Sequence, residues 1–184
     1  MTKKKIGISI CVVFILLLAV GFGFAHDFVM STAQKHIYYR KYESAVSRYS
    51  AEFGVSEALV YAVIKTESNF DPSARSRVGA SGLMQLTPET FIDVAERLAG
   101  DDPSGLDIND PETNIRYGIL YLSWLFEIFE SEKAVIAAYN AGPGRVLQWV
   151  KDDPELSSIP IGETRIYVAK VQKAKAAYTR LYYS

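Results

Sequence analysis

Residues 67 to 88 read ESNFDPSARSRVGASGLMQLTP, and this stretch decides how the rest of the chain is interpreted. It begins with a carboxylate, Glu67, at the point where an apolar helical pattern ends. Polar and turn-forming residues follow, then two glycines, Gly79 and Gly82, and a new helix starts at Thr87-Pro88. The sequence therefore predicts one acid at a helix end, facing a glycine-rich loop that a ligand can approach closely.

Two later stretches carry further polar and turn-forming residues. They are Ala138–Gly144, which reads AYNAGPG, and Glu163–Val168, which reads ETRIYV. In this order, the three stretches resemble the soluble-lytic-transglycosylase family, family 23 of the glycoside hydrolases, which shares the goose-lysozyme-like fold. The resemblance covers about residues 46–178 and departs at Thr87, where the family commonly has a methionine before the proline. It implies an all-α, lysozyme-like helical domain.

The resemblance also implies the site. Glu67 is the catalytic acid, and the residues expected to bind substrate come from all three stretches: Ser76, Gly82, Met84, Gln85, Tyr139, Asn140, Glu163 and Tyr167. A glutamate beside apolar residues suits general acid catalysis, because desolvation raises its pKa and keeps it protonated near neutral pH. The alternative for Glu67, from the helix pattern alone, is a surface ion pair.

Several of the other residue types fit sugar binding, and some of them have a structural alternative. Gly82 lacks a Cβ where a sugar ring could approach the backbone, and the neutral amide of Gln85 can bond an acetamido or hydroxyl group. Met84 fills either the floor of a cleft or the core. Glu163 and Tyr167, four residues apart, share a helix face, and the resemblance places both in the wall around the acid. For them, as for Tyr139 and Asn140, the alternative is a structural hydrogen bond.

The reaction implied by the resemblance needs one carboxylate. The acid protonates the oxygen between N-acetylmuramic acid and N-acetylglucosamine in peptidoglycan, and the muramyl N-acetyl group stabilises the cation. The carboxylate then takes the proton of the muramyl 6-hydroxyl, which leaves a 1,6-anhydromuramyl end. Asp71 is the nearest second carboxylate, but Asp-Pro at a helix end is typical of a turn. The alternatives are a goose-type lysozyme that uses water, and a non-catalytic protein that only binds the cell wall.

Composition excludes other chemistries. The chain has 184 residues and a net charge of -1, which falls to about -4 without Lys3-Lys4-Lys5, so no broad basic surface is available for nucleic acid. The only cysteine is Cys11, and the two histidines, His26 and His36, precede the globular region. A cysteine nucleophile, a Ser-His-Asp triad and a histidine-rich metal site are therefore not expected there, and we expect no metal or organic cofactor.

The N-terminus predicts a membrane anchor. Residues 6–25 form an uncharged run of 20 residues after the three lysines, long enough to span a bilayer with its N-terminus inside. The alternative is a cleaved signal peptide, because Gly23-Phe24-Ala25 fits a small-x-small cleavage site. The sequence thus predicts an anchor or signal at 1–25, a stalk at 26–45 and a catalytic domain at 46–184, lying outside the cytoplasmic membrane.

Periodicity predicts helices and no strands. An amphipathic pattern covers 30–53, and a helix capped by Ser56 leads to Glu67. Further helices are expected over about 87–98, 110–129, 131–139 and 145–150, and from Glu163 to the C-terminus. The 110–129 segment is apolar on nearly every side, which predicts that it is the buried central helix.

Overall fold

The structure is a computed structural model that describes residues 29–184. The predicted anchor or signal at 1–25 and the first residues of the predicted stalk lie outside the described residues. The chain divides into two compact units, Met1–Tyr39 and Arg40–Ser184. In the first unit, residues 29–37 are helical. Within 29–184, no helix combines the length and hydropathy needed to cross a bilayer.

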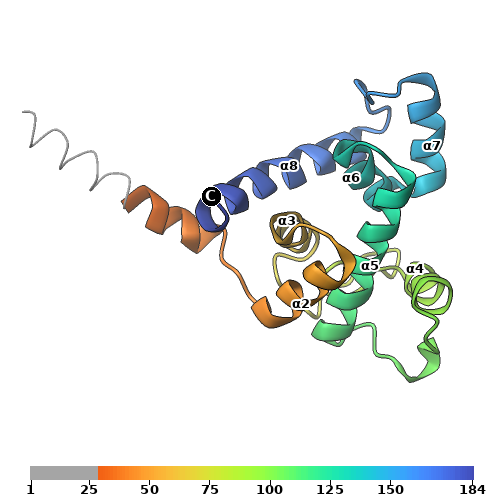
Figure 1. Cartoon of the computed structure of the whole chain (residues 1–184), viewed down its shortest axis with the longest axis horizontal. Coiled ribbons are helices and arrows are strands. Elements are labelled where there is room, and N and C mark those ends of the chain that lie inside the picture. Colours follow the sequence, from red (N-terminus) through yellow and green to blue (C-terminus); the bar gives the residue numbers. More distant parts are fainter. Residues whose placement is uncertain (1–28) are drawn as a thin grey trace, which may run out of the picture. The chain divides into compact units, whose positions relative to one another are not determined.

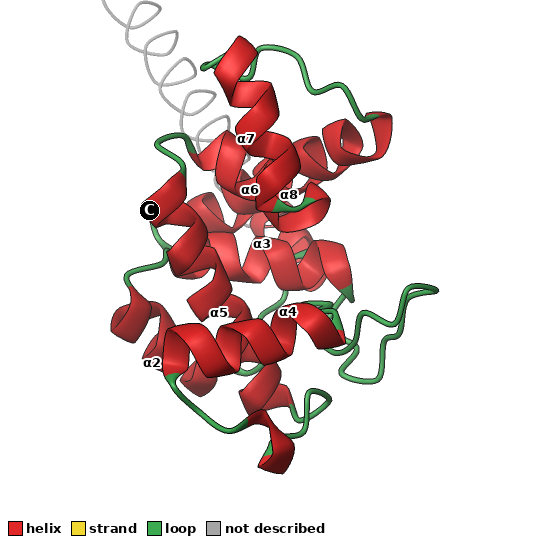
Figure 2. Cartoon of the chain, turned by 90° about the vertical axis from the view of Figure 1, so that its right-hand side faces the viewer, coloured by secondary structure: helices red, strands yellow, loops and turns green. Residues whose placement is uncertain are grey.

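The second unit contains all three motif stretches and is built from helices (Figures 1 and 2). Their bounds are α2 Glu43–Phe53, α3 Glu57–Glu67, α4 Pro88–Asp93, α5 Pro111–Ile128, α6 Glu132–Ala141, α7 Pro143–Asp152 and α8 Gly162–Tyr182, with a π-helical stretch, η1 (Val94–Ala99), and a 3-10 turn, η2 (Pro103–Gly105). No strand forms in the described part of the chain, where pairing is limited to isolated bridges at Ser81. The all-α prediction is confirmed.

Local capping explains where three of the helices begin. The side chains of Thr87, Asp110 and Ser131 accept hydrogen bonds from the backbone N–H three residues ahead, at the starts of α4, α5 and α6. Each of these bonds satisfies an N–H that has no partner within its own helix. Ser56 precedes α3 as predicted, but its side chain makes no capping bond. The N-terminus of α3 is therefore held by packing rather than by a side-chain cap.

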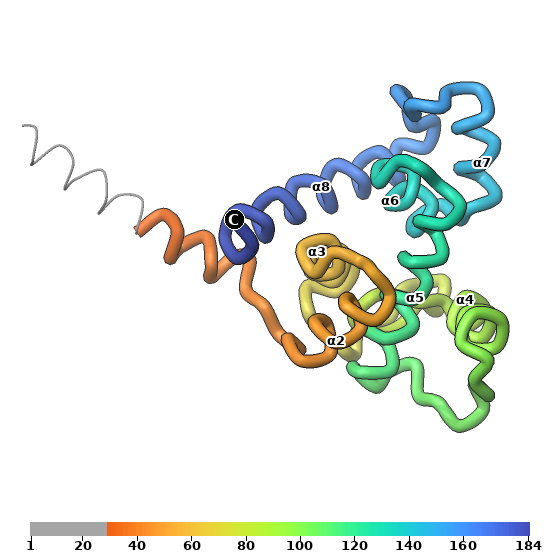
Figure 3. The backbone as a smooth tube through the Cα atoms, viewed as in Figure 1, coloured from red at the N-terminus to blue at the C-terminus, as the bar shows by residue number. Residues whose placement is uncertain are grey.

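The core is built on two helices, α3 and α5. Residues 58–64, seven in a row, are all buried. Figure 1 and the tube in Figure 3 show α3 between α2 and α8, and both helices pack against it. The predicted helix at 110–129 is central in that α5 packs against α2, α6 and η1, but it is not buried on every side, because Phe126 and Glu127 are exposed. The helix that carries Glu67 is thus enclosed over its middle seven residues.

Two predicted helices are interrupted. The amphipathic segment 30–53 breaks at residues 38–42, and Tyr42 adopts a left-handed backbone with φ 58° before α2 begins. The helix predicted over 87–98 continues as far as Ala99, but after Asp93 it widens into the π-helical η1. π-Helical turns are rare and occur frequently at functional sites. Apolar periodicity alone does not reveal either change.

Candidate active site

Glu67 is the last residue of α3, where the helix leaves the core. Its side chain is mostly enclosed, with part of its surface open to solvent. Burial raises the pKa of Glu67 to about 7, because the charged carboxylate loses hydration, and the hydroxyl of Tyr167 opposes this rise by donating a hydrogen bond to Oε1 at 2.7 Å. The group is therefore poised to hold or release a proton near neutral pH.

Two tyrosines from distant helices meet around this carboxyl. Tyr167 from α8 is buried, and Tyr139 from α6 donates its hydroxyl proton to the Met84 carbonyl at 2.8 Å. Burial raises the pKa of both tyrosines well above the usual value, and the negative charge of Glu67 raises both further. Tyr139, Tyr167 and Glu67 thus lie close together, with both phenols kept neutral. α3, α6 and α8 each supply one of these three side chains.

A buried asparagine, Asn114 at the start of α5, holds the glycine-rich loop. Its Oδ1 accepts from the Met84 N–H at 2.7 Å, and its Nδ2 donates to the Ser81 carbonyl at 3.0 Å and the Ile108 carbonyl at 2.8 Å. Gly82 has φ +78°, and a Cβ there would come within 2.4 Å of Asn114 Nδ2. The space beside Gly82 that the sequence assigned to a sugar ring is occupied by Asn114. Nothing in the local pattern at Asn114 pointed to this role.

Met84 belongs to the core. Its side chain is fully buried, and a Cβ on Gly118 of α5 would lie 2.4 Å from its sulfur. Of the two alternatives for Met84, the structure therefore supports core packing, and this corrects its place among the substrate-binding side chains. Its backbone carbonyl still reaches the site through the bond from Tyr139.

Gln85 and Ser76 also brace the loop. Gln85 has φ 49°, and its Nε2 donates to the carbonyls of Ala74 and Gly82, both at 2.9 Å. Its Oε1 makes no hydrogen bond within residues 29–184, so an acceptor remains for a ligand. Ser76 is exposed, and its hydroxyl accepts from the Ala80 N–H at 3.0 Å. Both side chains therefore make structural hydrogen bonds, which the sequence did not predict.

The predicted site residues Asn140, Glu163 and Tyr167 lie in different surroundings. Asn140 is partly exposed, and its Oδ1 accepts from the hydroxyl of buried Thr164 at 2.8 Å, which turns Nδ2 away from that contact. Glu163 is exposed and has no hydrogen bond or ion pair within the described chain. The structure thus brings Tyr167 to Glu67 and leaves Glu163 in solvent at the first turn of α8. Thr164, which orients Asn140, was missed because the pairing spans 24 residues.

Asp71 does not act as a partner of Glu67. It is exposed, and its Oδ1 accepts from the N–H and the hydroxyl of Ser73 at 2.9 and 2.7 Å, which lowers its pKa. This is a turn carboxylate, as the Asp-Pro sequence indicated. Within 29–184, His, Cys, Asp and Glu side chains form no group of three or more that could hold a metal ion.

Sequence and structure comparisons identify the family. The transglycosylase SLT domain family matches residues 44–161. This chain belongs to that family. It is 36% identical over 146 residues to the soluble lytic murein transglycosylase of Salmonella typhimurium, an alignment that covers 74% of this chain and 23% of the relative. It is 34% identical over 168 residues to the membrane-bound lytic murein transglycosylase C of Yersinia pestis, which covers 76% of this chain and 47% of the relative.

A solved structure in the same family has a similar fold. The inactive mutant of lytic transglycosylase Slt from Pseudomonas aeruginosa matches with a TM-score of 0.71 and 35% identity, over 78% of this chain and 24% of that one. The SLT-family chain described here thus spans about a quarter to a half of the length of these relatives.

Proposed function

We propose that this SLT-family chain is a peptidoglycan lytic transglycosylase in which Glu67 serves first as general acid and then as base. The observation that carries the proposal is the Glu67 carboxyl, with a pKa of about 7, at the end of a buried helix and bonded to Tyr167. Family membership supports the substrate class, since the relatives are named lytic murein transglycosylases.

The geometry supports a specific path for the proton in this reaction. Tyr167 donates to Oε1, so the carboxyl proton resides on Oε2, from which it passes to the oxygen between N-acetylmuramic acid and N-acetylglucosamine. The bond from the muramyl anomeric carbon to that oxygen breaks, and the N-acetyl group of the same sugar stabilises the cation. The ionised Glu67 then takes the proton of the 6-hydroxyl as its oxygen bonds the anomeric carbon. The product is a 1,6-anhydromuramyl end, and no water is consumed.

The remaining site residues belong to the same proposal. The acetamido and hydroxyl groups of the glycan form hydrogen bonds with Asn140 Nδ2, Gln85 Oε1 and the loop around Ser76. Tyr167 takes part from α8 through the carboxyl of Glu67, and the exposed carboxylate of Glu163, at the first turn of the same helix, is open to a group of the glycan. The catalytic domain acts outside the cytoplasmic membrane, held there by the run at 6–25 or secreted after its cleavage.

Mass spectrometry of digested peptidoglycan tests this function. Wild type is expected to release anhydromuramyl products, and Glu67→Gln is expected to lower the rate at least ~10²–10⁴-fold, because one group serves as both acid and base. Circular dichroism of the variant controls for folding. Reducing ends would instead indicate a lysozyme-type hydrolase, and glycan binding without cleavage by the wild type would indicate a wall-binding protein. Release by Glu67→Gln within a few-fold of wild type would remove Glu67 from its role.

A further inference from the structure

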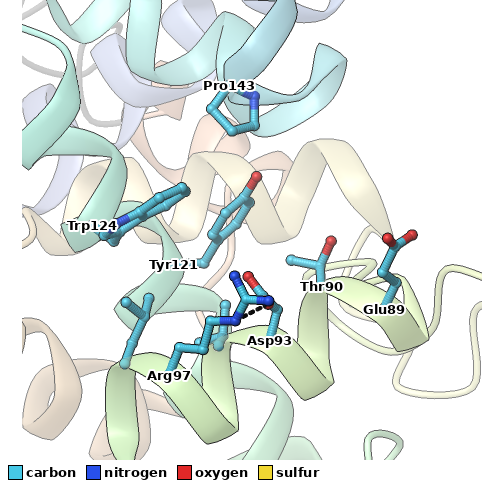
Figure 4. Close-up of a pocket in the computed structure, with 9 residues that line it drawn as sticks. Glu89, Thr90, Asp93, Arg97, Tyr121, Trp124 and Pro143 are labelled. Atoms are coloured by element: carbon cyan, nitrogen blue, oxygen red, sulfur yellow. Dashed lines mark ion pairs between the residues drawn. The ribbon is translucent and has the colours of Figure 1, made fainter.

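Charge is divided unevenly along the folded unit. Residues 40–163 contain 11 basic and 20 acidic residues, whereas residues 164–184 contain five basic residues and no acidic one. Figure 4 shows an example of the acidic part at α4, where Glu89 and Asp93 outnumber one cation, Arg97 of η1, whose Nε lies 2.7 Å from Asp93 Oδ1. The last helix, α8, is therefore a cationic element on an otherwise anionic unit.

One exposed face of α8 carries a basic stripe, made of Ile166, Lys170, Lys173 and Arg180. These positions follow the helical spacing i, i+4, i+7 and i+14, which places them on one side of the helix. Within residues 29–184, Lys170 and Lys173 make no hydrogen bond or ion pair. The other two cations of α8 are engaged elsewhere, since Arg165 donates to a backbone carbonyl at 2.9 Å and Lys175 Nζ lies 2.6 Å from Glu132 Oε2. The basic stripe thus presents uncompensated positive charge to solvent.

The basic stripe lies on the helix whose end meets the chain where it enters the folded unit. The guanidinium carbon of Arg40, the first residue of this unit, is 4.3 Å from the centre of the Tyr182 ring at the end of α8. The apolar run at 6–25 ends 15 positions before Arg40. A segment of this length spans at most about 50 Å when extended, and less where it is helical, as at 29–37. With the run held in a membrane, the end of α8 stays within this distance of the lipid surface.

We infer that the basic stripe docks on the anionic phospholipid headgroups of the membrane that anchors the chain. The inference rests on the anchoring that accompanies the proposed function. Each Lys or Arg near such a surface strengthens binding roughly 5-fold, and the attraction fades within a Debye length, about 10 Å at 0.1 M salt. The exposed lysines of the stripe can approach to within this distance. Ile166, which is 58% exposed, adds an apolar side chain that can enter the headgroup region.

Docking through α8 also gives the candidate site a defined orientation. Tyr167, on the buried side of the same helix, donates the 2.7 Å hydrogen bond to Glu67. The lipid surface that attracts the basic stripe repels the acidic side chains of α4, Glu89 and Asp93. The two charge signs therefore favour one orientation of the folded unit, in which lipid covers the exposed face of α8 and leaves its buried face, with the bond to Glu67, unchanged.

The test measures how fast lysines of the full chain react with an amine-acylating reagent that cannot cross a bilayer, with mass spectrometry as the readout. The chain is placed in vesicles of phosphatidylcholine, or of equal parts of phosphatidylcholine and phosphatidylglycerol. Lys170 and Lys173 are expected to react roughly 5- to 25-fold more slowly on the anionic vesicles. Lys151, exposed at the end of α7 and outside the stripe, should react equally on both. At 1 M salt, where the Debye length is about 3 Å, the protection should disappear.

Single substitutions tie the protection to charge. Lys170→Gln should lower the protection of Lys173 up to roughly 5-fold, and Lys173→Gln should do the same to Lys170, because each removes one cation from the stripe. Lys151→Gln is the matched control and should change neither. Circular dichroism of the variants controls for folding. Protection of Lys173 that is unchanged in Lys170→Gln would overturn the inference.

Three other results would also overturn it. Equal acylation of Lys170 and Lys173 on both kinds of vesicle would show that anionic lipid does not cover the stripe. Slower reaction that Lys151 shares would show adsorption of the whole unit without a preferred face. Protection on phosphatidylcholine alone that grows with protein concentration would show that the stripe is covered by a second copy of the chain.

Flotation of the vesicles separates this inference from the proposed function. No readout depends on cleavage, so a chain that releases no muropeptides refutes the transglycosylase proposal alone. A chain that floats only with the anionic vesicles, with Lys170 and Lys173 protected, supports docking of the stripe and removes the anchor at 6–25. A chain that floats with both kinds of vesicle and shows no protection keeps the anchor and overturns the inference.

Discussion

At the scale of single residues, the carboxyl of Glu67 is under two opposing influences. Burial raises its pKa, and the hydrogen bond from Tyr167 lowers it, leaving a value of about 7. Because the acid form starts the proposed reaction, kcat/KM is expected to fall as pH rises through about 7. Tyr167→Phe removes the lowering contribution, so the falling limb should move to higher pH. The pH profile of muropeptide release measures this, and a limb that moves to lower pH would contradict the assignment.

The same pKa makes a prediction about stability. The native carboxyl has a pKa of about 7 against an ordinary value of 4.5, so between these values the folded state binds more protons than the unfolded state. The contribution of Glu67 to the free energy of unfolding of wild type therefore falls as pH rises from 4.5 to 7. Above that window this contribution is constant. Glu67→Gln has no such loss.

Urea unfolding across this pH range provides the measurement. Relative to wild type, Glu67→Gln should become more stable by on the order of 1–3 kcal/mol between pH 4 and pH 8. Asp71→Asn is the control. Hydrogen bonds lower the pKa of Asp71, the opposite of the shift at Glu67, so this substitution should bring no gain in stability between pH 4 and pH 8. A stability difference for Glu67→Gln that is independent of pH would mean that the carboxyl titrates normally.

At the scale of elements, the glycine-rich loop depends on Asn114 in the first turns of α5. Gly82→Ala places a methyl group against a side chain held by three hydrogen bonds, and also forces alanine to φ +78°. We expect a loss of roughly 2–4 kcal/mol in the free energy of unfolding, from the left-handed backbone and the clash together. Activity should fall as well, because Met84 holds Tyr139 from the same loop.

Gly79→Ala is the matched control for this prediction. Gly79 has φ +85°, but a Cβ there meets nothing within 4 Å. It should lose only the backbone contribution, about 1–2 kcal/mol. If both variants lose the same amount in urea unfolding, the contact between Gly82 and Asn114 carries no energy.

The elements also show what the sequence could and could not predict. The helix starts at Thr87, Asp110 and Ser131 were predictable, because each capping bond joins residues three apart. Glu67 at a helix end was predictable for the same reason, since periodicity and Pro72 are local signals. Local rules also place apolar stripes on both α3 and α5, but they do not show that α8 packs on α3 while α6 and η1 pack on α5.

The parts of the site that were missed are long-range pairings. Asn114 meets Met84 across 30 residues, and Thr164 meets Asn140 across 24. Met84 was left between cleft and core because its surroundings come from Gly118 on a distant helix. Periodicity predicts on which side of a helix a residue lies, but it does not predict which residue of another element contacts it.

At the scale of the whole molecule, all side chains assigned to catalysis and binding lie in the compact unit Arg40–Ser184. Within this unit, Arg40 contacts the C-terminal helix, with its guanidinium carbon 4.3 Å from the centre of the Tyr182 ring and its Nη2 2.8 Å from Glu43 Oε2. Arg40 thereby joins the start of the unit to its last helix.

A chain shortened to begin at Tyr38 is therefore expected to be soluble, folded and active. It keeps Arg40 and every motif stretch and omits the apolar run at 6–25. Thermal unfolding and muropeptide release should match those of the full chain. In the shortened chain, Arg40→Ala should lower the free energy of unfolding by about 0.5–2 kcal/mol, the range for a partly buried cation–π contact, without changing the rate of release. Aggregation of the shortened chain, when a chain beginning at residue 29 stays soluble, would show that the folded unit starts earlier.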